Sequence, residues 1–462
     1  MLIYLLILVF AYTRLTNLMA FPPFLDETIY IRWLETIKAT NNWLLPLKEF
    51  GWEPFSIWIS TVINFFVKNS LLSLRLTAVI FGLLTCIILY LLLKKLAKPP
   101  AALFILLTYI TSPIILLHDR LGLRGDSVVS FALVLALYGL YFRLIKKQPQ
   151  KSYLISLAII IGLLTKTTAA TIPIIVLINF LIFKPKLKKP DFKALILTTT
   201  PFLFYFLTNT FNLVLNKFSI FINTNSFNFQ TKNNLLQIIP WFYQYLSWPI
   251  VFLFIAGIVL SFYQNKNFFK FFIISFLVPL LFVLFTAKIL FPRYLLLSYL
   301  SALVFAGFGL SHLYRYLPKL LRPLIIIFFL PSLFLSFNIT KNIQAAKLPE
   351  IERWQYVTGW PSGFGLTDMV NYLKTDTPDI LITENSDLIR SGLPYLWPET
   401  TIKIIPIIDN LDLPSINQDQ TIYLALNVLE ELPDKFEGEL LKEFFRPENK
   451  SSIKLYKIFE IK

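Results

Sequence analysis

The sequence is poor in cysteine, in histidine and in patterned glycine. It has one cysteine, Cys86, and two histidines, so an internal disulfide is impossible and the Cys and His content is too thin for a zinc site. Its 14 glycines form neither a P-loop nor a dinucleotide-binding fingerprint, so no nucleotide cofactor is implied. These absences exclude disulfide scaffolds, zinc modules and the common nucleotide-dependent enzymes.

Acidic residues are also scarce over most of the chain. Of 27 Asp and Glu residues, only eight precede residue 345, against 31 Lys and Arg in the same region. Carboxylates are costly in or beside a bilayer, so each of the eight is a functional candidate. Seven of them fall within 26–53 and 119–126. The eight are Asp26, Glu27, Glu35, Glu49, Glu53, Asp119, Asp126 and Asp191.

Apolar residues are abundant instead. The hydrophobic fraction is 56%, the aromatic fraction is 16% and the mean hydropathy is +0.64, which excludes an ordinary soluble domain. Apolar runs of roughly 17–25 residues recur, long enough to cross a hydrocarbon core of about 30 Å as helices. We therefore predict an α-helical polytopic membrane protein with about eleven transmembrane helices. The expected spans are 1–19 (uncleaved), 72–93, 100–117, 127–143, 153–165, 167–183, 194–212, 245–262, 269–288, 294–313 and 322–338.

The basic residues are distributed unequally between the two sides of these spans. Alternate connections carry seventeen Lys and Arg with Asp191 as their one acid, which predicts that they are cytoplasmic. The opposite connections hold the other seven carboxylates and are expected to face outward. This alternation requires two spans within 153–183, divided at Leu164–Thr167. The net charge of +16 is thus explained by loop orientation and does not indicate nucleic-acid binding.

The composition changes at residue 345, beyond which 19 acidic residues outnumber 12 basic ones. We predict two domains, a transmembrane domain at 1–344 and a soluble extracytoplasmic α/β domain at 345–462. In the transmembrane domain, the aromatic segments 20–71 and 213–244 are expected to form interfacial helices and an outer cap. The second domain is expected to have strands at 380–383, 402–407 and 422–426, and helices near 364–374 and 434–445.

Two pairs of outward acids are the candidate catalytic residues. Asp26 and Glu27 follow the first span, where a carboxylate is placed to take a proton from an acceptor hydroxyl or to bind a metal. The alternative is a solvated pair at a helix start. Asp119 and Asp126 lie in a second outer loop with His118, Arg120 and Arg124, a composition that suits phosphate and hydroxyl groups. The alternative for Asp126 is a helix N-cap.

Outward basic residues are candidates for binding a lipid phosphate. Lys166, Lys288 and Arg293 lie at outer turns, and Arg120 lies in the acidic loop. Lysines at such positions often only extend to lipid headgroups, so the alternative for each is snorkelling. A guanidinium binds a phosphodiester in a bidentate manner, which favours Arg293.

Over roughly residues 1–340, the chain resembles the GT-C superfamily of membrane glycosyltransferases. It is most similar to the family-39-like group of protein O-mannosyltransferases and lipid A aminoarabinose transferases. The resemblance rests on the order of several short motifs and on the acidic second loop. The motifs are Pro-Pro-x-x-Asp-Glu (22–27), Gly-Leu-Leu-Thr-Lys-Thr-Thr (162–168), Phe-Pro-Arg-Tyr (291–294) and, after the last span, Tyr-Val-Thr-Gly-Trp-Pro-Ser-Gly-Phe-Gly (356–365).

The resemblance implies sugar transfer from a polyprenyl-phosphate donor in an outward-facing cavity. It assigns Asp26 as the catalytic base or metal-site acid, with Glu27 as its partner. Asp126 best matches the second-loop acid, with Asp119 as the competing residue. Arg293 matches a position that contacts the donor phosphate. It leaves open whether a divalent metal such as Mg²⁺ or Mn²⁺ takes part, because related families differ.

The leading hypothesis is therefore a plasma-membrane glycosyltransferase with its active site and C-terminal domain outside the cytoplasm. Its acceptor is a hydroxyl of a lipid, a glycan or a protein. A transporter or flippase of lipid-linked glycans is the first alternative, although paired repeats with broken helices are not evident in the sequence. The second alternative is a non-catalytic scaffold for the exported domain.

Overall fold

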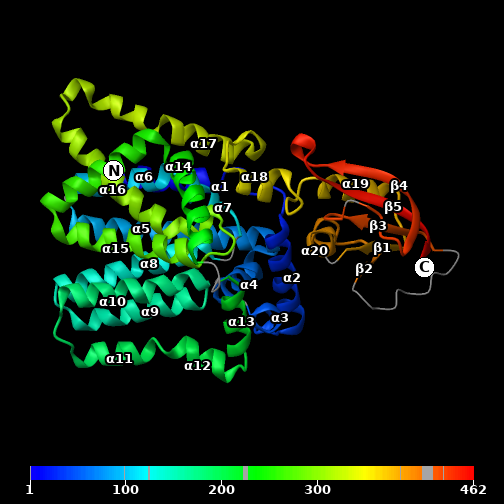
Figure 1. The fold of residues 1–462 in the computed structure, drawn as a ribbon, viewed down its shortest axis with the longest axis horizontal. Coiled ribbons are helices and arrows are strands. Elements are labelled where there is room, and N and C mark those ends of the chain that lie inside the picture. The colour runs from blue at the N-terminus through cyan, green and yellow to red at the C-terminus, as the bar shows by residue number, and fades with distance from the viewer. Residues whose placement is uncertain are drawn as a thin grey trace. The chain divides into compact units, whose positions relative to one another are not determined.

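A computed structural model of the chain describes residues 2–51, 53–97, 99–122, 125–221, 227–384, 387–407, 420–429 and 431–461. The chain divides into two compact units (Figure 1). The helical unit comprises Met1–Leu18 and Ile37–Ala346, and the α/β unit comprises Met19–Thr36 and Lys347–Lys462. The C-terminal boundary lies close to the expected residue 345. The segment 19–36, expected within the transmembrane domain, groups instead with the C-terminal part.

The helical unit is built from helices joined by short turns. Its helices are α1 (Leu2–Leu15), α3 (Leu45–Phe50), α4 (Phe55–Val67), α5 (Ser70–Leu96), α6 (Pro99–Thr111), α7 (Pro113–Arg120), α8 (Asp126–Leu140), α9 (Ser152–Leu163), α10 (Thr171–Phe183), α11 (Lys189–Leu197), α12 (Thr200–Leu207), α13 (Phe211–Phe221), α14 (Phe227–Gln264), α15 (Lys266–Thr286), α16 (Leu296–Tyr316) and α17 (Leu330–Lys341). Further 3-10 or π-helical segments extend or connect them: η1 (Tyr141–Ile145), η2 (Pro149–Lys151), η3 (Thr167–Ala170), η4 (Pro292–Leu295), the longer η5 (Lys319–Phe329) and η6 (Ile343–Ala345).

Six helices in the described residues are long and apolar enough to cross a membrane, and a seventh span arises if the bent pair α6–α7 is counted as one. The expected spans 1–19, 153–165 and 167–183 correspond to shorter apolar helices. The expected span 194–212 is divided into the short helices α11 and α12 because the chain breaks at Thr198 and Thr199. The predicted division of 153–183 is present, as a turn between α9 and η3.

Two spans in the part of the chain that the structure describes are broken, which we did not predict from the sequence. Helices α6 and α7 meet at an angle of 61°. Helix α14 is interrupted at Ser247, whose φ of 60° lies outside the helical region two residues before Pro249. Proline removes a backbone donor and clashes with the preceding turn, which accounts for a kink at this position.

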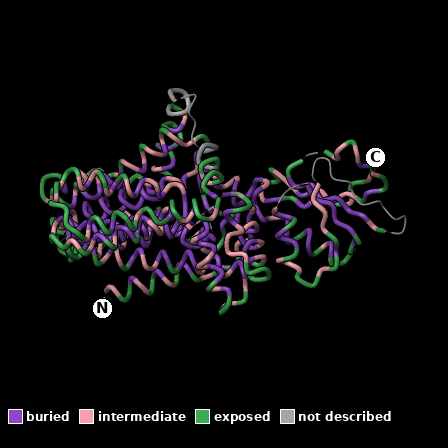
Figure 2. Tube along the Cα trace, turned by 90° about the horizontal axis from the view of Figure 1, so that it is seen from below, coloured by how far each residue is buried: buried purple, intermediate pink, exposed green. Residues whose placement is uncertain are grey.

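Helix α16 is the centre of the helical unit. Every residue from Leu296 to His312 is buried, and the tube in Figure 2 shows the buried segments gathered inside the unit with exposed segments around them. Helix α14 packs closely on α16, because a Cβ added to Gly257 would lie 1.9 Å from the Phe305 carbonyl oxygen. Small residues permit such close approach of helix backbones in apolar surroundings.

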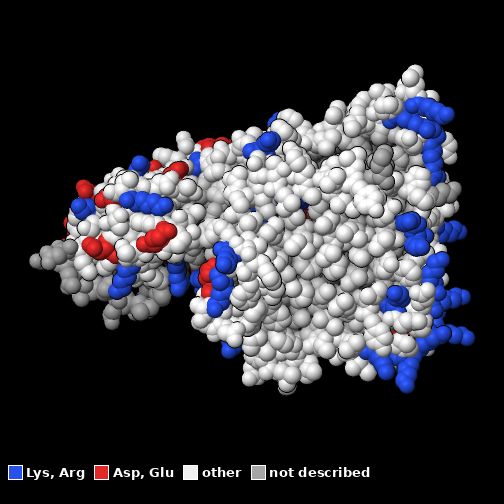
Figure 3. Space-filling view, turned by 180° about the vertical axis from the view of Figure 1, so that it is seen from behind, with Lys and Arg blue, Asp and Glu red and all other residues white. Residues whose placement is uncertain are grey.

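Basic side chains gather at one end of the helical unit. Figure 3 shows many of them along one edge of a largely uncharged face. By their positions in the chain they include Lys94 and Lys95 in the last turn of α5, Lys146 and Lys147 after η1, Lys184 and Lys186 after α10, and Lys266 at the start of α15. Asp191 accepts two hydrogen bonds there from Arg143, at 2.6 and 2.7 Å. Because α8 runs from Asp126 towards Lys146, Asp126 lies at the opposite end.

The α/β unit contains a mixed five-stranded sheet in the order β2-β1-β3-β5-β4. Strands β1 (Ile380–Thr383), β2 (Lys403–Pro406) and β3 (Ile422–Leu426) are parallel, whereas β4 (Phe436–Phe445) and β5 (Ser452–Ile461) are antiparallel. Helices α19 (Leu366–Thr375) and α20 (Asp387–Leu396) contribute apolar side chains to the core. Helix α2 (Leu25–Thr40) begins in this unit, and short helical turns lie at Glu350–Arg353 (α18), Trp354–Thr358 (η7) and Pro447–Asn449 (η8).

The expected helix near 434–445 is wrong, because this segment forms strand β4. Its many Glu, Leu and Lys residues favour a helix, but the segment pairs along its length with β5. The strands expected at 380–383, 402–407 and 422–426 and the helix at 364–374 match β1, β2, β3 and α19 to within two residues.

Candidate functional site

Asp126 lies in a buried cluster of charges at the start of α8. The ammonium group of Lys166 donates a hydrogen bond to one oxygen of its carboxylate. The Nδ1 atom of His118 lies 3.5 Å from the other oxygen. The side chains of Asp126 and Lys166 are only 2% and 7% exposed, so their charges meet in a medium of low polarity. The structure thus brings together one predicted acid and one predicted phosphate-binding cation.

Gly125 permits this close meeting. Its φ of +65° is left-handed, and a Cβ at this position would lie 2.3 Å from Cγ2 of Thr165. The first turn of α8 therefore approaches the turn after α9, where Thr165 and Lys166 donate their backbone N–H groups to the Gly162 carbonyl. Gly125 occupies the N-cap position, so Asp126 is the first helical residue and its side chain makes no capping bond. The capping alternative for Asp126 does not hold.

Arg293 supplies a second buried cation to the same cluster. It lies in the turn η4, is 5% exposed, and acts electrostatically on the Asp126 carboxylate. Its guanidinium carbon lies 4.7 Å from the ring centre of Phe291 and 5.8 Å from that of Tyr294. The Tyr294 ring centre also lies 5.4 Å from the Lys166 ammonium. Tyr294 thus contacts both cations, a role that its residue type alone did not indicate.

Asp119 belongs to a different network. The Nε atom of Arg14 lies 3.4 Å from its carboxylate, and Ser127 donates a hydrogen bond of 2.9 Å to the other oxygen. Arg14 also donates a bond of 2.7 Å to the Ile110 carbonyl, which ties α1 to the end of α6. Asp119 therefore links helices α1, α7 and α8. Arg14 was not a predicted site residue, although a lone arginine in an apolar span is a signal of a buried partner.

Arg120 binds backbone carbonyls at the end of α1. Its guanidinium donates to the carbonyl oxygens of Thr13, Arg14, Thr16 and Asn17 at 2.7–3.1 Å. The carbonyls of Thr13 and Arg14 belong to the last turn of α1, where a helix leaves its C=O groups without internal partners, and those of Thr16 and Asn17 lie just beyond it. Arg75 acts similarly on the Leu18 carbonyl, at 2.8 Å. Arg120 is thus engaged in closing a helix end, and Arg124 lies outside the described residues.

Asp26 and Glu27 lie in the α/β unit, in the first turn of α2. Both are buried, at 8% and 0% exposure, so the alternative of a solvated pair at this helix start does not hold. Helix α2 is held against the segment 356–365, where the backbone N–H of Leu25 donates to the Pro361 carbonyl at 2.9 Å. The two motifs 22–27 and 356–365 are thus parts of one structural element.

Lys288 is exposed in the bend that follows α15. Among the described residues, no group of three or more His, Cys, Asp and Glu side chains lies close enough to hold a metal ion. The expectation of a divalent metal therefore has no ligand set to support it in that part of the chain.

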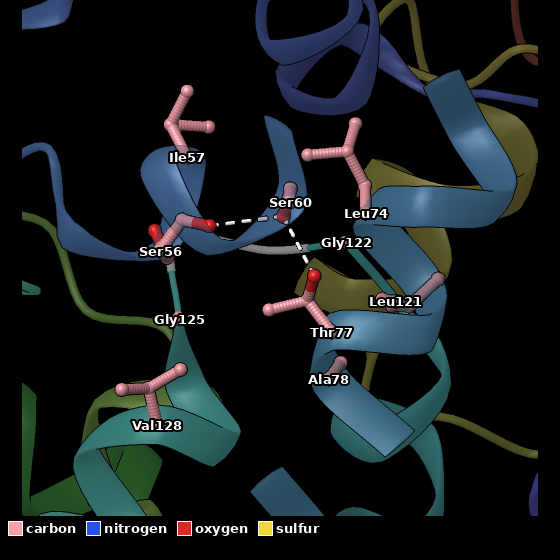
Figure 4. A pocket seen from close by; sticks show the side chains of 10 residues that line it. All are labelled: Ser56, Ile57, Ser60, Leu74, Thr77, Ala78, Leu121, Gly122, Gly125 and Val128. Carbon is pink, nitrogen blue, oxygen red and sulfur yellow. Dashed lines mark hydrogen bonds between the residues drawn. The ribbon is translucent and has the colours of Figure 1, made fainter. Parts of the chain in front are cut away.

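A small pocket lies beside the charged cluster, between α4, α5 and the start of α8 (Figure 4). Gly125, directly before Asp126, and Val128, two residues after it, form one wall. Ser56 and Ser60 from α4 and Thr77 from α5 form the polar part of its lining. Its cavity volume is about 20 Å³, enough for one group of about the size of a water molecule.

The sequence and the fold of the chain are similar to those of known proteins. The model of the family described as dolichyl-phosphate-mannose-protein mannosyltransferase matches residues 53–211, which contain both α8 and the Lys166 turn. The structure of ArnT from Cupriavidus metallidurans in the apo state aligns with 99% of this chain and 97% of its own, at a TM-score of 0.64 and 13% identity. The chain has a GT-C glycosyltransferase fold.

Two further solved structures share this fold. ArnT from the same organism bound to undecaprenyl phosphate aligns at a TM-score of 0.65 and 11% identity, with 99% and 97% of the two chains covered. The Archaeoglobus fulgidus oligosaccharyltransferase in the apo form aligns at 0.58 and 13% identity, with 88% of this chain and 64% of that one covered. No curated protein sequence matches the chain. The GT-C resemblance that the sequence motifs suggested is confirmed at the level of the fold.

Proposed function

We propose that the chain is a membrane glycosyltransferase that moves a sugar from a polyprenyl-phosphate carrier to an acceptor hydroxyl on the extracytoplasmic face. The observation that carries the proposal is the buried cluster of Asp126, Lys166, His118 and Arg293 at the end of the helical unit opposite the lysine-rich end. Two cations at such a place suit a lipid-linked phosphate, which remains at the membrane boundary while its chain lies in the bilayer. The undecaprenyl phosphate bound to the similarly folded ArnT supports this class of donor.

In this proposal the cations stabilise the leaving group. Breaking the bond between sugar and phosphate leaves negative charge on the carrier phosphate, and fixed positive groups in a poorly polar site favour that change. Arg293 provides a planar donor for two phosphate oxygens. Lys166 provides a point charge whose position is set by its hydrogen bond to Asp126. Asp126 is thus a positioning residue for Lys166, and it is preferred over Asp119 as the second-loop acid.

Asp26 is proposed as the base that accepts the proton of the acceptor hydroxyl, with Glu27 as its neighbour. The acceptor oxygen then bonds to the anomeric carbon as the phosphate departs. A positioned carboxylate typically contributes a factor of about 10²–10⁴ to such a step. The nature of the acceptor, whether lipid, glycan or protein, does not change these roles.

The test is sugar transfer by the purified full-length protein in detergent or nanodiscs. Undecaprenyl phosphate carrying mannose, glucose or 4-amino-4-deoxyarabinose serves as donor, with membrane lipids, oligosaccharides and peptides as acceptors. Loss of transfer in Asp26→Asn and Arg293→Ala variants that fold normally supports the proposal. Movement of the intact lipid-linked sugar across a vesicle membrane, without bond cleavage, would instead establish the flippase alternative.

A further inference from the structure

The pocket beside Asp126 has an uncharged polar lining, which distinguishes it from the charged cluster. Ser60 donates a hydrogen bond to the Ser56 carbonyl at 2.9 Å, and Thr77 donates to the Ser73 carbonyl at 2.8 Å. The hydroxyl oxygens of Ser60 and Thr77 are 2.8 Å apart. Figure 4 shows Ser60 and Thr77 meeting across the pocket, with the start of α8 on its other side. The remaining wall is formed by glycine and by small or aliphatic residues.

These two hydroxyls are set up to accept further hydrogen bonds. Each hydroxyl has one proton and two acceptor lone pairs. Ser60 and Thr77 together have two hydroxyl protons, and three acceptors compete for them: the two backbone carbonyls and the neighbouring hydroxyl oxygen. Neither hydroxyl therefore has a proton to spare for a ligand. The two hydroxyl oxygens have four lone pairs in total, and at most one of these accepts a proton, in the contact between Ser60 and Thr77. A group that bonds to Ser60 and Thr77 must therefore donate, as an O–H or N–H group does and a fully ionised phosphate or carboxylate does not.

The size and location of the pocket define that group further. A volume of about 20 Å³ admits one hydroxyl or amino substituent and excludes a whole sugar ring. Gly125 lines the pocket, and the next residue, Asp126, holds Lys166 of the charged cluster. A Cβ at Gly125 would lie 3.1 Å from Cβ of Ser56, so this glycine also keeps the wall of the pocket clear.

We propose that this pocket receives a hydroxyl or amino substituent of the donor sugar and selects sugars by that substituent. The assignment rests on the proposed function, because it places the sugar next to the group that binds its phosphate. Ser60 and Thr77 accept the substituent's hydrogen bond, and the aliphatic wall excludes charged groups. A sugar without a donor at that position leaves the buried hydroxyls unmatched, which lowers its affinity.

The test compares binding of lipids with and without sugar to the full-length protein. The probes are undecaprenyl phosphate alone and undecaprenyl phosphate carrying mannose, glucose or 4-amino-4-deoxyarabinose. Thr77→Val keeps the side-chain shape and removes the hydroxyl. Thr85→Val is the matched control, because Thr85 lies on the same helix, is buried, and donates to the carbonyl four residues earlier at the same 2.8 Å.

We expect the unaltered protein to bind at least one sugar-bearing lipid more tightly than the bare phosphate. Thr77→Val should weaken that binding by about threefold to tenfold, the range for one hydrogen bond, while binding of undecaprenyl phosphate stays the same. Thr85→Val should change neither. Ser60→Ala should act in the same direction as Thr77→Val.

Several results would overturn the assignment. One is equal affinity for the bare and all sugar-bearing lipids, and another is an equal loss for both kinds of lipid in Thr77→Val. An effect of Thr77→Val confined to the KM of the acceptor would also exclude a donor-sugar site. Failure of the proposed function is measured separately, as the absence of sugar transfer from any of these lipids by the unaltered protein, and it leaves the binding comparison between Thr77→Val and Thr85→Val intact.

Discussion

Replacement of Asp126 by Asn tests whether the charged cluster has a functional role beyond stability. The change leaves the Lys166 ammonium without its carboxylate partner at a place where both side chains are less than a tenth exposed. Removing one partner of a buried ion pair costs about 3–5 kcal/mol in unfolding free energy. Because Lys166 also loses the group that positions it, we expect sugar transfer per folded molecule to fall by at least about 100-fold.

The matched control is Asp191→Asn at the other end of the helical unit. Asp191 forms a buried pair with Arg143 in which the side chains are 6% and 4% exposed. Its loss should reduce unfolding free energy by the same order, about 3–5 kcal/mol, yet leave transfer per folded molecule unchanged. A double variant, Asp126→Asn with Lys166→Met, removes both charges and should regain part of the lost stability without regaining transfer.

Two measurements on the purified protein decide the outcome: denaturant unfolding in detergent, and transfer from an undecaprenyl-phosphate sugar normalised to folded protein. If Asp126→Asn and Asp191→Asn reduce transfer per folded molecule equally, the effect is not specific to the charged cluster. If Asp126→Asn retains full transfer, the positioning role of Asp126 is refuted. Recovery of transfer in the double variant would show that Lys166 is not needed.

Four further results are expected. Asp26→Asn should lower the transfer rate by about 10²–10⁴ with little change in donor binding, measured as a KM-against-kcat comparison. Arg293→Lys should raise the Kd for undecaprenyl phosphate, since an ammonium lacks the bidentate geometry, and an unchanged Kd would argue against phosphate contact. Gly125→Ala should destabilise the protein by about 1–3 kcal/mol through its left-handed φ and reduce transfer, both measured beside the unaltered protein. Burial opposes ionisation of Asp191, but its hydrogen bonds from Arg143 outweigh this and hold its pKa below the ordinary value. Its stabilisation should therefore be complete above about pH 4 and disappear as the pH falls through the lowered pKa, and Asp191→Asn should abolish this part of the stability–pH profile.

Much of the fold was predictable because membrane insertion imposes simple length and charge patterns. Apolar runs located α5, α8, α15 and α16, and the lysine-rich connections predicted one basic end. Helices shorter than a full span and the breaks at α7 and Ser247 were not predicted. Prolines such as Pro113 and Pro249 do not by themselves locate a break, because neighbouring helices can satisfy the backbone groups that a proline frees within a continuous span. The strand at Phe436–Phe445 depends on pairing with β5, which local helix propensity does not register.

For the site, two facts pointed to Asp26, Glu27, Asp119 and Asp126: acidic residues are scarce in the membrane domain, and a carboxylate in or beside a bilayer is costly in free energy. The sequence could not show which of Asp119 and Asp126 is the second-loop acid. The two residues are only seven positions apart, and this spacing does not indicate which cation each carboxylate contacts. The tertiary structure separates them, since Arg14 from α1 reaches Asp119 and Lys166 from the turn after α9 reaches Asp126. The sequence determined which charges the membrane domain contains, and only the packing of distant helices decided which of them are paired.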